Sequence, residues 1–203
     1  MFTGIVAAVG NITQVTPLTN ESDSGLRLVI DAGPLSMQDV ALGDSIAING
    51  ACMTVVSKTD QQFCVDISRE SLRLTSGLDQ TGPVNLEKAL TLADRLGGHL
   101  VSGHVDGLGT VIKFVQVNES WELVISAPPN LAKYLAYKGS IVVNGVSLTV
   151  NAVTDFADHC EFSMNLIPHT LQVTTLKHLK SGARVNLEID LIARYVERMM
   201  SVQ

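Results

Sequence analysis

The sequence lacks any long run of apolar residues, and none approaches the roughly 18 residues that a membrane-spanning helix needs. Its first six residues, MFTGIV, contain no lysine or arginine and recur in altered form later in the chain, which argues against a cleaved secretory signal. Basic residues are also few, with 14 Lys and Arg against 20 Asp and Glu. Nucleic-acid binding requires clustered basic side chains, so we expect neither a membrane nor a nucleic-acid partner.

Cysteine is scarce as well. Cys52, Cys64 and Cys160 are odd in number and form no CxxC pair, which suits a reducing, cytoplasmic location and argues against a disulfide framework. His99 and His104 lie five residues apart in a stretch expected to be extended, so their side chains point to opposite faces. The sequence therefore predicts no metal site.

What the chain does contain is an internal repeat. The segment SIAINGACMTV (45–55) returns as SIVVNGVSLTV (140–150). Three further pairs keep the same order: FTGIV (2–6) with VSGHV (101–105), SLRLT (71–75) with TLQVT (170–174), and VNLE (84–87) with VNLE (185–188). A period of about 100 residues is too long for a solenoid, so we expect two copies of one domain, each able to form its own core. Two differences between the copies stand out, Cys52 against Ser147 and Ile5 against His104.

The local pattern is mostly that of β-strands. Asn49-Gly50 and Asn144-Gly145 separate apolar runs, and such Asn-Gly pairs favour tight hairpins because both residues tolerate positive φ. Short runs rich in β-branched residues, bounded by turn residues, predict strands at 26–30, 45–48, 52–56, 63–67 and 84–86. Each half is therefore expected to be a small antiparallel barrel or sandwich.

Two stretches have helical patterns instead. Residues 129–138 begin with a proline and place apolar side chains on one face, and residues 190–200 form a second such stretch with Asp190 as its expected N-cap. In the second stretch one stripe carries Leu191, Ile192, Tyr195, Val196 and Met199. This helix either closes the second barrel or joins subunits. We favour oligomerisation, because both barrel cores should be complete without it, and the 46% of hydrophobic residues also suggests subunit contacts.

The strand after each Asn-Gly turn is a first candidate site, because Cys52 and Thr54 share one face, as do Ser147 and Thr149. A lone strand cysteine is often only a small buried hydrophobe, and threonine is an ordinary strand residue. Both interpretations remain open for these positions.

The glycine-rich segment GGHLVSGHVDG (97–107) is a second candidate site, since closely spaced glycines let a ligand approach the backbone. His104 stands where the first copy has Ile5, so the fold does not require a histidine there. We expect His104 to transfer protons. His99, His159, His169 and His178 show no such signal and are expected to be surface residues.

Six ordered motifs along nearly the whole chain resemble the riboflavin synthase family: MFTGIV (1–6), NGACMTV (49–55), GGHLVSGH (97–104), YKG (137–139), NGVSLTV (144–150) and LIPHT (166–170). The resemblance implies an all-β fold with a C-terminal helix, built from two tandem homologous six-stranded Greek-key barrels. It divides the chain into an N-terminal lumazine-binding barrel (1–97), a C-terminal lumazine-binding barrel (98–189) and an oligomerisation helix (190–203).

The resemblance also implies an activity. Members of this family are transferases that dismutate two molecules of 6,7-dimethyl-8-ribityllumazine, without a cofactor, to riboflavin and 5-amino-6-(D-ribitylamino)uracil in the last step of riboflavin biosynthesis. It implies a homotrimer assembled through the C-terminal helix, with a site between the N-barrel of one subunit and the C-barrel of its neighbour. The resemblance also suggests lumazine synthase as a candidate protein partner.

Matching the motifs by position gives the expected site residues. The catalytic candidates are Cys52, His104 and Ser147. The expected N-barrel pocket consists of Gly4, Ile5, Val6, Cys52, Met53, Thr54, Asp66, Ile67, Ser68, Arg69, Glu70 and Ser71. The expected C-barrel pocket consists of Gly103, His104, Val105, Lys138, Ser147, Leu148, Thr149, Asn165, Leu166, Ile167, Pro168, His169 and Thr170.

Asn144 departs from the pattern, since some relatives have aspartate there, and no carboxylate role carries over. The rival interpretation is a non-catalytic lumazine or flavin carrier of the same fold. Such carriers lose the Ser-Gly-His element and its cysteine partner, whereas this chain keeps Cys52 and the element at 102–104, which favours the enzyme. A flavin-dependent reductase is a third interpretation, but no nucleotide-binding segment follows the barrel.

Overall fold

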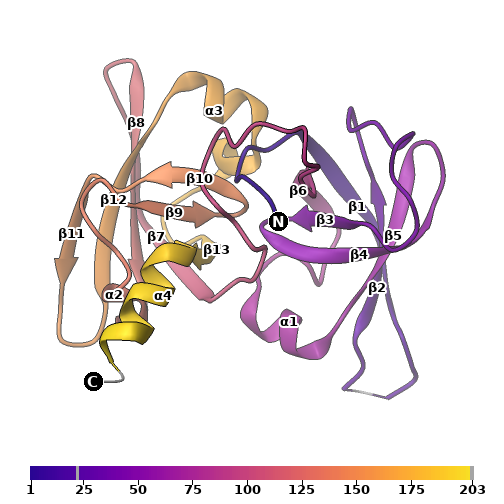
Figure 1. Ribbon diagram of the computed structural model, residues 1–203, viewed down its shortest axis with the longest axis horizontal. Helices are drawn as coiled ribbons and strands as arrows, with labels where there is room; N and C mark the ends of the chain where they lie inside the picture. Colours follow the sequence, from indigo (N-terminus) through magenta and orange to yellow (C-terminus); the bar gives the residue numbers. More distant parts are fainter. Residues whose placement is uncertain (22, 202–203) are drawn as a thin grey trace.

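Two β-sheets, one from each half of the chain, lie side by side in the molecule (Figure 1). This computed structural model describes residues 1–21 and 23–201, so residues 202–203 of the expected C-terminal segment lie outside the described residues. The first half contains β1 (Ala8–Pro17), β2 (Leu26–Asp31), β3 (Ser45–Ile48), β4 (Ala51–Lys58), β5 (Gln62–Ile67), α1 (Arg69–Leu74) and β6 (Gly82–Lys88). The second half contains β7 (Gly107–Val117), β8 (Ser120–Ala127), α2 (Pro129–Ala132), β9 (Ser140–Val143), β10 (Val146–Thr149), β11 (Ala152–Asp155), β12 (Cys160–Leu166), α3 (Pro168–Val173), a 3-10 helix (Thr175–His178), β13 (Arg184–Ile189) and α4 (Leu191–Met200).

The first half is a closed barrel with strand order β1-β2-β5-β4-β3-β6. Strands β2, β5, β4 and β3 lie in Greek-key order, in which three strands joined by hairpins are flanked by a fourth that arrives from elsewhere in the chain. Alternate residues point inward, as in β5, where Phe63, Val65 and Ile67 are fully buried and their neighbours are half-buried. The strands expected from sequence in this half are all present.

The second half repeats this order as a seven-stranded sheet, β10-β9-β13-β7-β8-β12-β11. Strands β10 and β11 are consecutive pieces of chain separated only by Val150 and Asn151, and together they occupy the place of β4 in the first barrel. The interruption falls where β4 itself is irregular, at the register shift between Val55 and Ser57. The expected fold of two tandem barrels with a C-terminal helix is therefore confirmed, with one wall of the second barrel in two pieces.

The two Asn-Gly turns are hairpins, as expected. Asn49 and Gly50 have φ of 46° and 85°, and Asn144 and Gly145 have 47° and 82°, which are the positive values of a type I′ turn. The turns also meet at the junction of the barrels, because a Cβ added to Gly50 would lie 2.8 Å from the backbone nitrogen of Gly145, and the reverse contact is also 2.8 Å. Only glycine fits at either position.

Four asparagines around these turns join the two halves. The Asn85 side chain donates to the Asn144 carbonyl at 2.8 Å, and the Asn186 side chain donates to the Asn49 carbonyl at 3.0 Å. The side-chain oxygens of Asn49 and Asn144 in turn accept from the backbone N–H of Asn85 and Asn186. Since buried amides are costly unless satisfied, this network fixes how the barrels sit against each other.

Two short segments cross from one half to the other. We call residues 2–6 the first strap and residues 101–106 the second strap. They pair at Phe2 and Val101, whose backbone N–H and carbonyl groups bond at 2.8 and 3.1 Å. Phe2 and Val101 are buried together with Ala47 and Val142 between the barrels. Beyond this crossing, Val105 packs against the first core and Val6 against the second.

The helices differ from expectation in one case. The expected helix over 129–138 ends at Ala132, after which the chain continues in turns with three-residue hydrogen bonds from Tyr134 to Leu131 and from Leu135 to Ala132. The chain then changes direction before β9, where Lys138 adopts a φ of 64°. Leu131 is buried as expected, with Tyr134 and Leu135 packed beside it.

The C-terminal helix is confirmed, with the Asp190 side chain accepting from the Ile192 N–H at 2.9 Å. No residue of α4 is buried, and Ile192, Tyr195 and Met199 are 63%, 63% and 74% exposed. The helix therefore does not complete the second core, and its apolar stripe faces outward. None of the helices in the described part of the chain is both long and apolar enough to cross a membrane.

Candidate active site

The first pocket is a cavity of about 180 Å³ on the first barrel, where Cys52 and His104 come together. Cys52 is half-buried on β4 and faces away from the barrel core, whereas its neighbour Met53 points inward and is buried. His104 arrives on the second strap and is exposed. The lining residues are Ala51, Cys52, Met53, Ser71, Leu74, Thr75, Gly103, His104 and Val105.

Close backbone contact holds the second strap against Cys52. The Cys52 N–H donates to the Gly103 carbonyl at 2.7 Å, and a Cβ added to Gly103 would lie 2.7 Å from the Cys52 Cβ. Gly103 also has a φ of 79°, so a side chain here would be both clashing and strained. This explains the glycine in front of His104.

Buried carboxylates fix both straps. The Glu188 side chain accepts from the Ser102 N–H and hydroxyl at 2.7 Å each and from the Gly103 N–H at 3.0 Å. In the first strap, Glu87 accepts from the Thr3 N–H and hydroxyl at 2.7 Å each and from the Gly4 N–H at 3.0 Å. Burial raises the pKa of both carboxyls, and the hydrogen bonds from Thr3 and Ser102 oppose that rise.

The expected grouping of residues into pockets is wrong in one respect. Matching the family motifs by position placed residues 4–6 beside Cys52 and residues 103–105 beside Ser147. The straps cross instead, so His104 lies with Cys52, and the Ser147 N–H donates to the Gly4 carbonyl at 2.7 Å. Cys52 and His104 therefore belong to one pocket of one chain.

Around Ser147 the structure places a second set of groups. A Cβ added to Gly4 would lie 2.6 Å from the Ser147 Cβ, and one added to Gly98 would lie 3.0 Å from it. Ile5 is about half exposed beside this position, and Val6 packs into the second core. This set corresponds to the first pocket, with Ile5 in the place of His104.

His99 is also part of this set, contrary to the expectation of a surface residue. Its Nδ1 lies 2.7 Å from the Ser147 hydroxyl, and its backbone N–H donates to the Thr3 carbonyl at 3.1 Å. Burial lowers the pKa of His99, which favours the neutral imidazole that can accept a proton from Ser147. The internal repeat did not mark His99, because it lies between the copies and has no counterpart, although the family motif GGHLVSGH (97–104) contains it.

The remaining expected residues of the first barrel lie where β5 runs into α1. Ser71 lines the pocket, and Ser68 caps α1 by accepting from the Ser71 N–H at 3.1 Å. Asp66 is paired with Arg27 at 2.7 Å, and Ile67 is fully buried in the core. The other members, Thr54, Arg69 and Glu70, are exposed and do not line this cavity.

The second barrel repeats this arrangement where β12 runs into α3. Asn165 and Ile167 are exposed, Leu166 is buried, and Thr170 is half-buried on α3, whose first turn also carries Pro168 and His169. Lys138 lies before β9, with its ammonium 3.2 Å from the Asn151 side-chain oxygen. Leu148 is half-buried and Thr149 exposed on β10.

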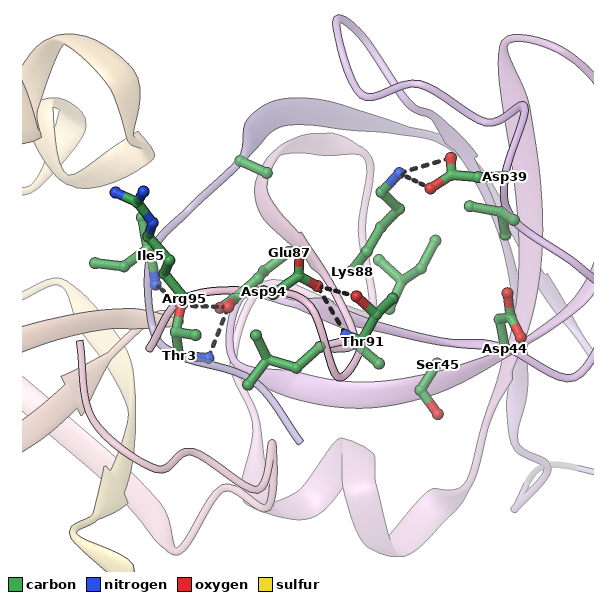
Figure 2. Close-up of a pocket in the computed structure, with 15 residues that line it drawn as sticks. Thr3, Ile5, Asp39, Asp44, Ser45, Glu87, Lys88, Thr91, Asp94 and Arg95 are labelled. Atoms are coloured by element: carbon green, nitrogen blue, oxygen red, sulfur yellow. Dashed lines mark hydrogen bonds and ion pairs between the residues drawn. The ribbon is translucent and has the colours of Figure 1, made fainter. Parts of the chain in front are cut away.

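A larger cavity lies elsewhere, on the edge of the first barrel beside residues 89–95 (Figure 2). It measures about 670 Å³, but its charged groups largely satisfy one another. Lys88 pairs with Asp39 at 2.7 Å, and Asp94 accepts from the Thr91 N–H at 2.7 Å and from its hydroxyl at 2.9 Å. A binding site requires polar groups free to face a ligand, so this cavity is a weaker candidate than the smaller pocket.

Within residues 1–21 and 23–201, no three His, Cys, Asp or Glu side chains are grouped so as to hold a metal ion. The two sets carry thiol, hydroxyl and imidazole groups. Each barrel presents one such set, and the set around Cys52 borders a cavity.

Comparisons with known proteins identify the ligand class. A family model described as a lumazine binding domain matches twice, at residues 3–89 and 102–190. The chain is 44% identical to riboflavin synthase of Photobacterium phosphoreum, covering 100% of this chain and 90% of the relative. It is 44% identical to riboflavin synthase of Mycobacterium tuberculosis, covering 98% of both, and 38% identical to that of Bacillus subtilis.

Solved structures give the same result. The structure of LumP complexed with 6,7-dimethyl-8-(1'-D-ribityl) lumazine superimposes with a TM-score of 0.78 at 26% identity, covering 93% of this chain and 98% of that one. The structure of LumP complexed with riboflavin superimposes with a TM-score of 0.79, also at 26% identity. The fold is therefore that of two-barrel lumazine-binding proteins. Within that class, the chain belongs to the riboflavin synthase family.

Proposed function

We propose that the protein dismutates two molecules of 6,7-dimethyl-8-ribityllumazine to riboflavin and 5-amino-6-(D-ribitylamino)uracil, a transferase reaction that needs no cofactor. The observation that carries this proposal is the pair of corresponding sets, one bringing Cys52 to His104 beside a cavity and the other bringing Ser147 to His99, where we infer a second pocket. One lumazine would bind to each pocket. The lumazine ring system serves as both donor and acceptor of the four-carbon unit.

The reaction requires a proton to leave the acidic 7-methyl group of one ring and a nucleophile to add at C7 of the other. The Ser147 hydroxyl, hydrogen-bonded to a neutral His99, fits the role of an activated nucleophile. His104 and Cys52 fit the proton transfer in the first pocket. Holding two rings in register supplies a further part of the rate enhancement.

The remaining binding groups suit the ribityl chain. Its hydroxyls can bond to the side chains of Ser71 and Thr170, which occupy corresponding positions in the two halves. They can also bond to the ammonium group of Lys138, which lies just before β9. A 180 Å³ cavity is smaller than the roughly 300–1,000 Å³ of a complete small-molecule site. We infer that a neighbouring chain supplies the missing wall.

We further propose that the functional unit is a homotrimer joined through α4. The exposed apolar stripe of this helix supports a subunit contact. In this proposal residues 1–97 and 98–189 are the lumazine-binding barrels and residues 190–203 the assembly segment. The three free cysteines suit a cytoplasmic location, where lumazine synthase, as the source of the substrate, is a candidate partner.

A second candidate function is that of a carrier that binds lumazine or flavin without converting it, which the structural likeness to LumP favours. The experiment that separates the two is incubation of the purified protein with the lumazine alone, following riboflavin absorbance. We expect turnover that survives dialysis against a chelator. Tight binding without riboflavin formation would establish the carrier, and a rate lost to the chelator and restored by metal would contradict the cofactor-free mechanism.

A further inference from the structure

The second strap has an attachment that the first strap lacks. The Asp106 carboxylate accepts from the Ile189 N–H at 2.9 Å and from the Arg194 guanidinium at 2.7 Å. Its side chain is only 14% exposed, so this charge-assisted contact is partly shielded from water. The corresponding residue at the end of the first strap is Ala7, directly after residues 2–6, and its side chain cannot make such a bond.

This attachment lies two residues from His104. The strap is held on one side by Glu188, which binds Ser102 and Gly103, and on the other by Asp106, whose own N–H also donates to the Leu187 carbonyl at 2.8 Å. Only His104 and Val105 lie between the two attachments. The position of the His104 side chain therefore depends on both.

Arg194 belongs to α4, which is held to the barrel by polar contacts. No residue of the helix is buried, and besides that of Arg194 the side-chain hydrogen bonds from α4 to the barrel, among the described residues, are those of Glu197 with Lys133 at 2.5 Å and with the Tyr134 hydroxyl at 3.2 Å. Arg194 therefore joins α4 directly to the end of the second strap through Asp106.

We propose that Arg194 is a positioning residue that acts through Asp106 on the placement of His104 in the first pocket. The inference deepens the proposed function and rests on it, because it assumes that His104 acts on the lumazine. It links two features found only in the second half, the helix and the aspartate.

The test uses Arg194→Gln and Asp106→Asn, with Lys133→Gln as the matched control. Lys133→Gln also removes an ion pair between α4 and the barrel, but that pair does not touch the strap. We expect kcat to fall about tenfold in the first two variants, because small misplacements of a reacting group are costly, while KM changes less than about twofold. The double variant should be no slower than either single one, since both remove one interaction.

Lys133→Gln should keep the parent kcat, and Arg194→Lys should recover part of the lost rate. Native mass spectrometry is run on each variant, because a loss of rate that tracks a loss of assembly would overturn a positioning role. An equal loss of kcat in Lys133→Gln would overturn it as well.

A measurement without substrate separates this inference from the proposed function. In the ligand-free protein, the Gly103 amide and His104 ring resonances should shift in Arg194→Gln and stay unchanged in Lys133→Gln. Unchanged resonances in Arg194→Gln would overturn the coupling even if the protein makes riboflavin. Shifted resonances in a protein that makes no riboflavin would support the coupling and reject the proposed function instead.

Discussion

At the scale of single residues, the hydrogen bond between Ser147 and His99 is the contact with the clearest chemical consequence. A serine hydroxyl is a weak nucleophile at neutral pH and needs an adjacent base. In the proposed function His99 is this base, since its Nδ1 lies 2.7 Å from the Ser147 hydroxyl and burial lowers its pKa. The repeat comparison pointed to Ser147, whereas His99 lies between the two copies.

This pair predicts a pH dependence. Activity should fall as the pH falls from about 6.5 through the lowered pKa of His99, since protonation removes the base. His99→Gln should lose this acidic limb, and its kcat should drop by roughly 10²- to 10⁴-fold, the usual range for general-base catalysis. The measurement is kcat against pH for the parent and the variant.

The stability of the protein should change with pH in the same direction as its activity. Because the folded-state pKa is depressed, the contribution of His99 to stability is present above its unfolded pKa and is lost as the pH falls through the folded one. His178→Gln, at an exposed position, is the control and should change neither curve. If the kcat of His99→Gln still falls at acidic pH as it does in the parent, His99 is not the base.

At the scale of elements, the two Asn-Gly turns do more than reverse the chain. They meet at the junction of the barrels, and each is packed against the other's backbone. Replacing a glycine of these turns can therefore destabilise the protein in two ways, through the strain of a positive φ and through the clash of the added Cβ. These two costs can be measured separately.

We predict that Gly50→Ala destabilises the protein more than Gly43→Ala. Both glycines have positive φ, 85° and 92°, so each substitution should cost about 1–2 kcal/mol of backbone strain. A Cβ on Gly43 would meet nothing within 4 Å, whereas one on Gly50 would meet backbone and should cost roughly 1–3 kcal/mol more. Urea unfolding of both variants measures the difference, and equal losses would show that the contact between the turns yields freely.

How far the sequence predicts these elements depends on whether the deciding contact is local. The hairpins and the strands of the first half were predictable, because turn residues and alternating burial act within a few residues. The α4 cap was predictable for the same reason. The end of α2 at Ala132 was not, because the following turn is set by the route to β9.

The site was predictable only in part, for a related reason. The repeat identified Cys52, His104 and Ser147, since it aligns corresponding positions in the two copies. It does not say against which copy a segment packs, so the crossing of the straps was missed. The paired glutamates Glu87 and Glu188 carried a usable signal, because a charged residue repeated in two apolar strands implies a shared buried role.

At the scale of the whole molecule, the two sets of groups belong to different barrels of one chain. The hairpins that carry Cys52 and Ser147 meet at their turns, and in Figure 1 α1 lies near the lower edge of the molecule and α3 near its upper edge. The cavity beside Cys52 measures about 180 Å³, less than the roughly 300–1,000 Å³ of a complete small-molecule site. The proposed function therefore pairs a ring on one chain with a ring on its neighbour.

The crossed straps determine how this is tested by mixing inactive chains. Cys52→Ala and His104→Ala both damage the first pocket, so mixing them leaves no intact first pocket and should restore nothing. Cys52→Ala leaves the second pocket intact, and Ser147→Ala leaves the first intact. In randomly mixed trimers of these two, about a quarter of the head-to-tail interfaces would join two intact pockets.

We therefore predict that co-refolded Cys52→Ala and Ser147→Ala chains recover up to about a quarter of the parent rate, well above either variant alone, as expected for heterologous interfaces between chains. Native mass spectrometry establishes that mixed trimers form, and riboflavin absorbance measures their rate.

The mixture of Cys52→Ala with His104→Ala is the matched control, because it passes through the same refolding and assembly. Rescue in that control would mean that Cys52 and His104 serve different sites, against the geometry of the first pocket. Mixed trimers of Cys52→Ala and Ser147→Ala that stay as slow as their parents would place both lumazines on one chain, and the wall that closes the 180 Å³ pocket would then have to come from a movement within that chain.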